Sequence, residues 1–337
     1  MERLPLAISL GDPAGVGPEL IVRCWEALAG TDCAPIAVVG GANVLRSTAE
    51  RIGVDLPLAQ IDGIADAATY WPHSLPVLDM ADADYTPGEP NADGARLALA
   101  SLQAACGLAR SGEAAALVTA PVAKDNLAAA GFTHPGQTEF LADRCGIAPE
   151  DAVMMLAGPR LRTVPITVHL ALSKVPASLT SEMIRRRTTI AAKALQRDFG
   201  IAEPRVAIAG LNPHAGENGR FGSEEADIIT PAIRALREAG MRVTGPHPGD
   251  ALFTPRARDT YDLAVCMYHD QALIPLKALD FDEGVNVTLG LPIVRTSPDH
   301  GTAFDIAGKG VADPGAMLAA IRMASDCAAR RRDNASR

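Results

Sequence analysis

Aromatic side chains are scarce in this chain, and their scarcity limits how its core can be built. Only 4% of the 337 residues are Phe, Trp or Tyr, although 48% are hydrophobic. The core must therefore consist mainly of Ala, Val, Leu and Ile, which suits packed layers of helices and strands. The length exceeds that of the commonest single domain, so the sequence predicts an α/β protein of two domains.

Cysteine pairs and long apolar runs are also missing. The six cysteines are scattered without a CxxC spacing, in a chain too large to need disulfide staples. No segment approaches about 18 uninterrupted apolar residues, and the N-terminal apolar run is too short for a signal peptide. We therefore expect reduced cysteines, a cytoplasmic location and no membrane partner.

Positive charge is not in excess either. The net charge of -9 argues against binding to a nucleic-acid backbone as the main function. Local basic residues can still hold a small anion, so the expected partner is a small molecule.

The common glycine motifs for nucleotides are absent after the first predicted strand. Residues 4–10 are apolar and run into GDPAGVGPE, and a helical pattern follows with Pro18 in its first turn. This loop lacks the GK[ST] of a phosphate loop and the spacing of GxGxxG. It still places backbone N–H groups at the carboxyl edge of a sheet, where anions bind. The segment TAPVAKD repeats this pattern of a strand followed by a loop and a helix. Lys124 lies at the start of that helix and is either a ligand contact or a solvated surface lysine.

Three histidines follow apolar strands at the points where the chain turns polar. They are His169, His214 and His269. In a parallel sheet the carboxyl ends share one edge, so the imidazoles are expected to meet there. Such a set can hold Zn²⁺ and leave a fourth position for substrate. A buried, hydrogen-bonded histidine is the alternative for His169, and spacing alone leaves the metal site open because no HExxH-like pair occurs.

The stretch from Tyr268 to Gly310 holds the densest set of reactive side chains. It contains a His-Asp pair, Lys277, Arg295 and the segment HGTAFDIAGKG, whose glycines predict tight turns. We interpret it as the centre of the functional site.

Several segments together carry a family resemblance that spans nearly the whole chain. They are GDPAGVGPE, TAPVAKD, PGQTEF, LNPHAGENGRFGSEE, YHDQALIPLK and RTSPDHGTAFDIAGKG. They closely resemble the 4-hydroxythreonine-4-phosphate dehydrogenases of pyridoxal phosphate biosynthesis. The last segment is also similar to the cofactor loop of isopropylmalate and isocitrate dehydrogenases. The resemblance implies an isopropylmalate-dehydrogenase-like fold of two α/β/α domains with a central cleft, and not a Rossmann dinucleotide domain.

The implied domains are discontinuous in sequence. Residues 1–135 with 290–337 would form the first domain and carry the cofactor loop. Residues 136–289 would form the second and carry the metal site and the dimer interface. Residues 55–90, rich in Asp, Pro and Ala, are expected to be connecting structure with weak strands at most.

The resemblance also implies roles for particular residues. The implied metal ligands are His169, His214 and His269, with the site completed across a homodimer interface. The implied substrate contacts are Gln137, Thr138, Lys277, Asn286 and Arg295. The implied catalytic groups are Asp250, Asp270 and Lys277. The implied contacts to NAD or NADP are His300, Gly301, Thr302, Asp305 and Gly308. Zn²⁺ is the implied metal, with Mg²⁺ and Co²⁺ as alternatives.

The implied reaction is a metal-dependent oxidation of 4-phosphooxy-L-threonine by NAD(P). Its β-keto acid product would lose CO2 to give 3-amino-2-oxopropyl phosphate. One alternative is a decarboxylating dehydrogenase of another four-carbon hydroxy-acid phosphate or of a terephthalate-type cis-dihydrodiol. A non-catalytic metal- or metabolite-binding protein is an alternative of another class. Lys124, Lys277 and Arg295 together favour an anionic, phosphorylated substrate.

One position departs from the family pattern. Family members usually have PGHTE where this chain has PGQTE, so Gln137 replaces a substrate-binding histidine. Glutamine donates a hydrogen bond but carries no positive charge, which weakens contact with a phosphate. His134 either compensates for this loss or is a turn residue. Thr138 is expected to cap the helix that follows.

Overall fold

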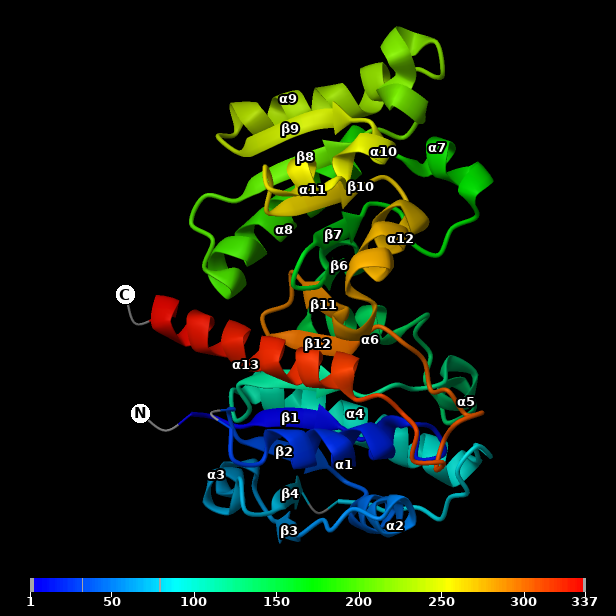
Figure 1. The fold of residues 1–337 in the computed structure, drawn as a ribbon, viewed down its shortest axis with the longest axis vertical. Helices are drawn as coiled ribbons and strands as arrows, with labels where there is room; N and C mark the ends of the chain where they lie inside the picture. Colours follow the sequence, from blue (N-terminus) through cyan, green and yellow to red (C-terminus); the bar gives the residue numbers. More distant parts are fainter. Residues whose placement is uncertain (1–2, 32, 79, 336–337) are drawn as a thin grey trace. The chain divides into compact units, whose positions relative to one another are not determined.

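The computed structural model describes residues 3–31, 33–78 and 80–335. The chain forms two compact units (Figure 1). The first unit comprises Met1–Pro149 with Leu291–Arg332, and the second comprises Glu150–Gly290 with Asp333–Arg337. The domain boundaries expected from the sequence stay a prediction.

The first unit is built on a parallel sheet. Its strand order is β3-β4-β2-β1-β5-β12. The strands are β1 (Leu6–Ser9), β2 (Ile36–Val39), β3 (Leu58–Ile61), β4 (Leu75–Leu78), β5 (Ala116–Thr119) and β12 (Arg295–Pro298). The segments LAIS, IAVV and ALVT are buried at every position, as parallel strands covered on both faces should be. The four-residue strands β3 and β4 lie within residues 55–90, where weak strands at most were expected.

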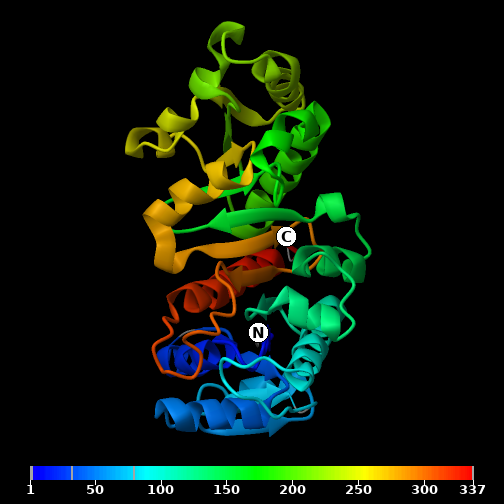
Figure 2. The same ribbon diagram turned by 90° about the vertical axis from the view of Figure 1, so that its right-hand side faces the viewer.

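Helices cover both faces of this sheet. They are α1 (Gly17–Leu28), α2 (Ala42–Ile52), α3 (Ala67–Tyr70), α4 (Ala92–Ser111), α5 (Lys124–Ala129), α6 (Gln137–Cys145) and α13 (Gly315–Ala335). The crossovers β1-α1-β2 and β4-α4-β5 run in opposite directions along the sheet, so right-handed connections put α1 and α4 on opposite faces. Figures 1 and 2 show this arrangement, with α2 beside α1.

The second unit is built on a mixed sheet. Its strand order is β11-β6-β7-β10-β8-β9. The strands are β6 (Val153–Ala157), β7 (Arg162–Pro165), β8 (Arg205–Ala209), β9 (Arg242–His247), β10 (Leu263–Cys266) and β11 (Val285–Leu289). Strand β6 is antiparallel to both β11 and β7. Strands β7, β10, β8 and β9 are mutually parallel, so their carboxyl ends share one edge.

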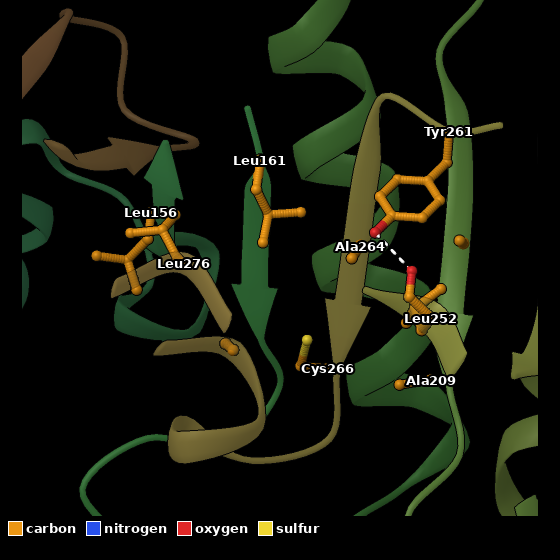
Figure 3. Close-up of a cluster of buried hydrophobic side chains, with 10 residues drawn as sticks. Leu156, Leu161, Ala209, Leu252, Tyr261, Ala264, Cys266 and Leu276 are labelled. Atoms are coloured by element: carbon orange, nitrogen blue, oxygen red, sulfur yellow. Dashed lines mark hydrogen bonds between the residues drawn. The ribbon is translucent and has the colours of Figure 1, made fainter. Parts of the chain in front are cut away.

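The helices of the second unit pack on that sheet around an aliphatic core. They are α7 (Val175–Ser178), α8 (Ser181–Phe199), α9 (Thr230–Glu238), α10 (Gly249–Leu252), α11 (Pro255–Arg258) and α12 (His269–Asp280). Figure 3 shows Leu276 of α12 beside Leu156 of β6, and the Tyr261 hydroxyl donating to the Leu252 carbonyl over 3.0 Å. This core fixes the start of α12, where His269 lies.

No helix in residues 3–31, 33–78 and 80–335 has both the length and the apolarity needed to cross a membrane.

Candidate active site

Three adjacent parallel strands carry the predicted metal ligands at their carboxyl ends. Strand β10 pairs with β7 on one side and with β8 on the other. His169 follows β7, His269 follows β10 and His214 follows β8, each within a few residues of the strand end. The three histidines therefore leave the sheet at the same edge, and Asp250 follows β9 at that edge.

Two of the three histidines are direct neighbours. The ring centroids of His169 and His269 lie 5.8 Å apart, and both rings line a cavity of about 370 Å³. His214 lines a second cavity of about 590 Å³, together with Asp250. Tyr268 and Asp270 line both cavities.

The His269 ring is oriented by the residue next to it. Its Nδ1 lies 2.7 Å from Asp270 Oδ1. A carboxylate only accepts hydrogen bonds, so Nδ1 carries the proton and the lone pair of an uncharged ring is on Nε2. Carboxylates commonly orient metal-ligating histidines in this way. The His269–Asp270 pair is therefore suited to metal binding through Nε2.

Backbone strain is concentrated in the predicted site segments. Among the residues that the structure describes, the non-glycine residues with left-handed φ are His169, His214, Ala215, Glu217, Asn218 and Ala303. The first two are predicted metal ligands, and Ala303 belongs to HGTAFDIAGKG. Each such residue costs roughly 1–2 kcal/mol, so the surrounding structure must hold these backbones in place. Strain of this kind gathers where function requires a fixed geometry.

The strained turn that carries His214 is Pro213–Gly219, called the left-handed turn below. Five consecutive residues, 214 to 218, have φ between 40° and 78°. Glu225 accepts hydrogen bonds from the backbone N–H groups of Leu211 and Asn212, both over 2.8 Å, just before this turn. Glu225 was not identified from the sequence, because nothing in the segment Ser-Glu-Glu at residues 223–225 indicates which of the two carboxylates is buried.

The donor chemistry of this edge fits a divalent metal, although one chain does not complete the site. Within the described ranges, no group of three His, Cys, Asp or Glu side chains lies close enough to hold a metal ion. Two imidazoles nevertheless lie side by side, and one of them has a carboxylate behind it. One chain thus offers a partial set of ligands with the right chemistry.

The predicted substrate residues of the first unit form a second cluster. Arg295 of β12 is 4% exposed, and its Nη2 donates to Thr119 Oγ1 over 2.7 Å and to Gln137 Oε1 over 3.0 Å. Burial lowers the pKa of Arg295 to about 10, so the guanidinium is still protonated at neutral pH. A buried guanidinium of this kind can hydrogen-bond an anion.

The first turn of α6 adjoins this guanidinium. The helix begins at Gln137, with extended Gly136 before it and no side-chain cap. The expectation that Thr138 caps the helix was wrong, since Thr138 lies inside the first turn. The free N–H groups of this turn favour an anion. Lys124 is close, because a Cβ placed on Gly136 would lie 3.7 Å from its Nζ.

His134 belongs to an aromatic cluster. Its ring centroid lies 5.5 Å from those of Phe132 and Phe140, and its Nε2 lies 3.3 Å from Asp143 Oδ2. These contacts favour the interpretation of His134 as a turn residue over its compensating for Gln137.

Lys277 and Asn286 belong to the second unit. Lys277 is half-buried on α12, and Asn286 lies in β11. The buried Oδ1 of Asn286 has no hydrogen-bond partner among the atoms of the described chain. A buried acceptor of this kind is unusual in proteins and is consistent with a ligand contact.

The predicted cofactor residues lie in one loop that packs on the N-terminal loop of the same unit. The Thr302 carbonyl accepts from Val16 N–H over 2.9 Å, and a side chain on Gly15 would collide with that carbonyl. Glu19, only 1% exposed, accepts from Ala312 N–H over 2.9 Å and anchors the end of the loop to α1. His300 and Asp305 are exposed. Glu19 is a second positioning residue that sequence reasoning missed.

The fold and these clusters define an α/β protein with the predicted site residues in loops at the carboxyl ends of parallel strands. The model of the family described as pyridoxal phosphate biosynthetic protein PdxA matches residues 31–324. The chain belongs to this family, which confirms the resemblance found in the sequence.

Individual relatives agree with this assignment. The chain is 61% identical over 329 residues to the 4-hydroxythreonine-4-phosphate dehydrogenase of Erythrobacter litoralis, with 98% of each chain covered. The chain is 41% identical in sequence to a 4-hydroxythreonine-4-phosphate dehydrogenase from Klebsiella pneumoniae, whose crystal structure it matches with a TM-score of 0.88. The match covers 97% of this chain and 98% of that one. A terephthalate 1,2-cis-dihydrodiol dehydrogenase from Burkholderia xenovorans is 34% identical, with a TM-score of 0.66 and coverage of 96% and 98%.

Proposed function

We propose that this protein is a dehydrogenase that oxidises the CH–OH group of 4-phosphooxy-L-threonine in pyridoxal phosphate biosynthesis. It would use NAD or NADP and a divalent metal, and its β-keto acid product would lose CO2 to give 3-amino-2-oxopropyl phosphate. The observation that carries the proposal is the delivery of His169, His269 and His214 to one edge by three adjacent strands. Family membership supports the choice of substrate.

A metal held by the three histidines would act as a Lewis acid on the substrate hydroxyl, and NAD held by residues 300–308 would accept the hydride. Asp270 keeps the proton on His269 Nδ1 and so leaves Nε2 free to bind. Asp250 and Asp270 line the cavity beside His214, where either carboxylate can accept the hydroxyl proton. Lys277, on the same helix as His269, supplies positive charge for the substrate.

The anionic end of the substrate would bind at the start of α6. Arg295 supplies charge, and the first-turn N–H groups of α6 supply donors. Gln137 Oε1 accepts from Arg295, so the Gln137 amide nitrogen is the group left to donate to a ligand. Lys124 adds a second positive charge beside the same turn.

The metal site would be completed in a homodimer. Large hydrophobic side chains are exposed next to the three histidines, and they are Leu170, Leu172, Phe221 and Ile274. Their exposed fractions range from 37% to 66%. Exposed apolar side chains gathered in this way mark an interaction surface. A second copy of the chain that covers them can supply the ligands that one chain lacks.

Replacing Ile274, which is 66% exposed on α12, with aspartate is expected to convert the dimer to a monomer. A buried, unpaired carboxylate in an apolar interface costs several kcal/mol, which is enough to shift the equilibrium roughly 100-fold or more. Light scattering coupled to gel filtration measures the mass, and metal content should fall with it. Leu4→Asp, at a 51% exposed position in the first unit, serves as control and should stay dimeric. A dimeric Ile274→Asp variant with full metal content would contradict the interface.

Substrate choice can be tested by following NAD reduction. We expect kcat/KM for 4-phosphooxy-L-threonine to exceed that for a terephthalate cis-dihydrodiol by about 100-fold or more, because Arg295 and Lys124 favour the phosphorylated anion. The dihydrodiol is the second candidate because the uncharged Gln137 weakens the phosphate site and a dihydrodiol dehydrogenase is 34% identical. The reverse preference would replace the proposal with the dihydrodiol reaction. Calorimetry that detects no NAD binding would favour a non-catalytic binding protein.

A further inference from the structure

We infer that Glu225 is a positioning residue that fixes His214 for metal binding by holding the base of the left-handed turn. The inference rests on the proposed function, because it takes His214 as a metal ligand. Glu225 is 6% exposed and is absent from the residues that line the cavity of His214. It therefore acts through the backbone that carries His214.

The carboxylate of Glu225 is fully engaged by the segment before the turn. Oε1 accepts from the N–H groups of Leu211 and Asn212, both over 2.8 Å, and Oε2 accepts from Asn212 Nδ2 over 3.0 Å. These hydrogen bonds to an ionised, buried carboxylate are of the strong class. They fix the backbone at 211 and 212, directly before Pro213.

Glycines on both sides leave room for this carboxylate. A Cβ on Gly210 would lie 3.1 Å from Glu225 Oε1, and a Cβ on Gly216 would lie 2.6 Å from Oε2. Gly216 also has φ 78° and lies within the left-handed turn. The carboxylate therefore touches the chain on both sides of His214, before and after it in sequence.

The element that carries Glu225 is itself irregular. Glu225–Ile229 is a π-helical turn, and Ser181 Oγ donates to the Ile228 carbonyl over 2.6 Å. Turns of this kind are often found at functional sites. The π turn packs against the left-handed turn.

A second side chain joins the same strand end to the segment of His269. Gln271 Nε2 donates to the Gly210 carbonyl over 2.8 Å, and its Oε1 accepts from Met267 N–H over 2.6 Å. Residues 210–212 are thus held from one side by Glu225 and from the other by Gln271. A shift at Glu225 would therefore move His214 relative to His269.

Glu225→Gln tests the inference, because it keeps the size of the side chain and removes its charge. Its amide nitrogen would face N–H donors, so the left-handed turn should loosen. We expect Co²⁺, used as the probe metal, to bind roughly 10–100-fold more weakly in calorimetry, with a changed visible spectrum of the bound ion. Hydrogen exchange at the Leu211 and Asn212 amides should be faster in the metal-free protein, which tests the contact without any activity assay.

Asp227→Asn is the matched control, since Asp227 is an exposed carboxylate on the same π turn. It should bind Co²⁺ as the unchanged protein does. Thermal unfolding of the metal-free variants shows whether each variant is folded. If Glu225→Gln does not fold, Glu225→Asp takes its place, and the same weakening of Co²⁺ binding is expected. A folded Glu225 variant with unchanged Co²⁺ affinity would overturn the role of Glu225 but not the proposed metal site. Failure of the unchanged protein to bind Co²⁺ would overturn the proposed metal site and the inference with it.

Discussion

Replacing His214 with alanine is expected to abolish metal retention and turnover together. His214 is one of three imidazoles delivered to one sheet edge, and no other side chain of the left-handed turn offers an equivalent nitrogen. A bound metal contributes several kcal/mol of transition-state stabilisation, so kcat should fall at least about 1000-fold. Metal content of the purified protein and initial rates of NAD reduction are the measurements.

His73 provides the matched control for this substitution. It is exposed on a turn of the first unit, so His73→Ala should keep both metal and activity. His214→Ala with full metal content and full activity would show that the assigned ligands are wrong. Loss of activity with metal retained would instead assign His214 to the substrate.

Replacing Arg295 with glutamine is expected to lower kcat/KM by about 100-fold or more. The guanidinium is buried against Thr119 and Gln137, and each hydrogen bond between a charged donor and a bound anion contributes about 1.5–3 kcal/mol. Most of the loss should appear in KM, because the contact is made to the anionic group and not to the reacting carbon.

Arg96→Gln serves as the control for charge removal, since Arg96 is exposed and pairs with Asp93 on α4. Its kinetic constants should match those of the unchanged protein. If Arg295→Gln kept the original KM for the phosphorylated substrate, the anionic group of the substrate would not bind at the start of α6.

Strand ends were the part of the site that the sequence could predict. A fully buried parallel strand is an unbroken apolar run, so its end is visible where the first polar residues appear. This rule placed His169, His214 and His269 after strands, and β7, β8 and β10 confirm that placement. Their common edge then follows from parallel pairing alone.

Short strands and helix starts were harder to predict. Strands β3 and β4 have four residues each, and prolines near them resemble a connecting segment. Thr138 resembles an N-cap, yet extended Gly136 already turns the chain into α6 and the helix starts one residue before Thr138. Capping preferences describe averages, and glycine is also accepted at that position.

The supports of the site could not be found from sequence. Left-handed backbone is normally signalled by glycine, asparagine, aspartate or histidine, but Ala215 and Glu217 give no such signal. Their conformations depend on distant partners such as Glu225, whose burial depends on the tertiary structure. The candidate reactive residues could therefore be predicted from the sequence, whereas the residues that hold them in position could not.

The order in which the strands are synthesised constrains how the first unit can assemble on the ribosome. Strand β5 pairs with β1 on one side and with β12 on the other, and Arg295 of β12 pairs with Leu117 of β5. All of the second unit except its last few residues is translated between these two strands. At about 5–20 residues per second, one edge of β5 stays open for roughly 9 to 35 s while residues 120–294, which include the continuous Glu150–Gly290 segment, are synthesised. The nascent chain therefore exposes one unpaired edge of an apolar strand for that time.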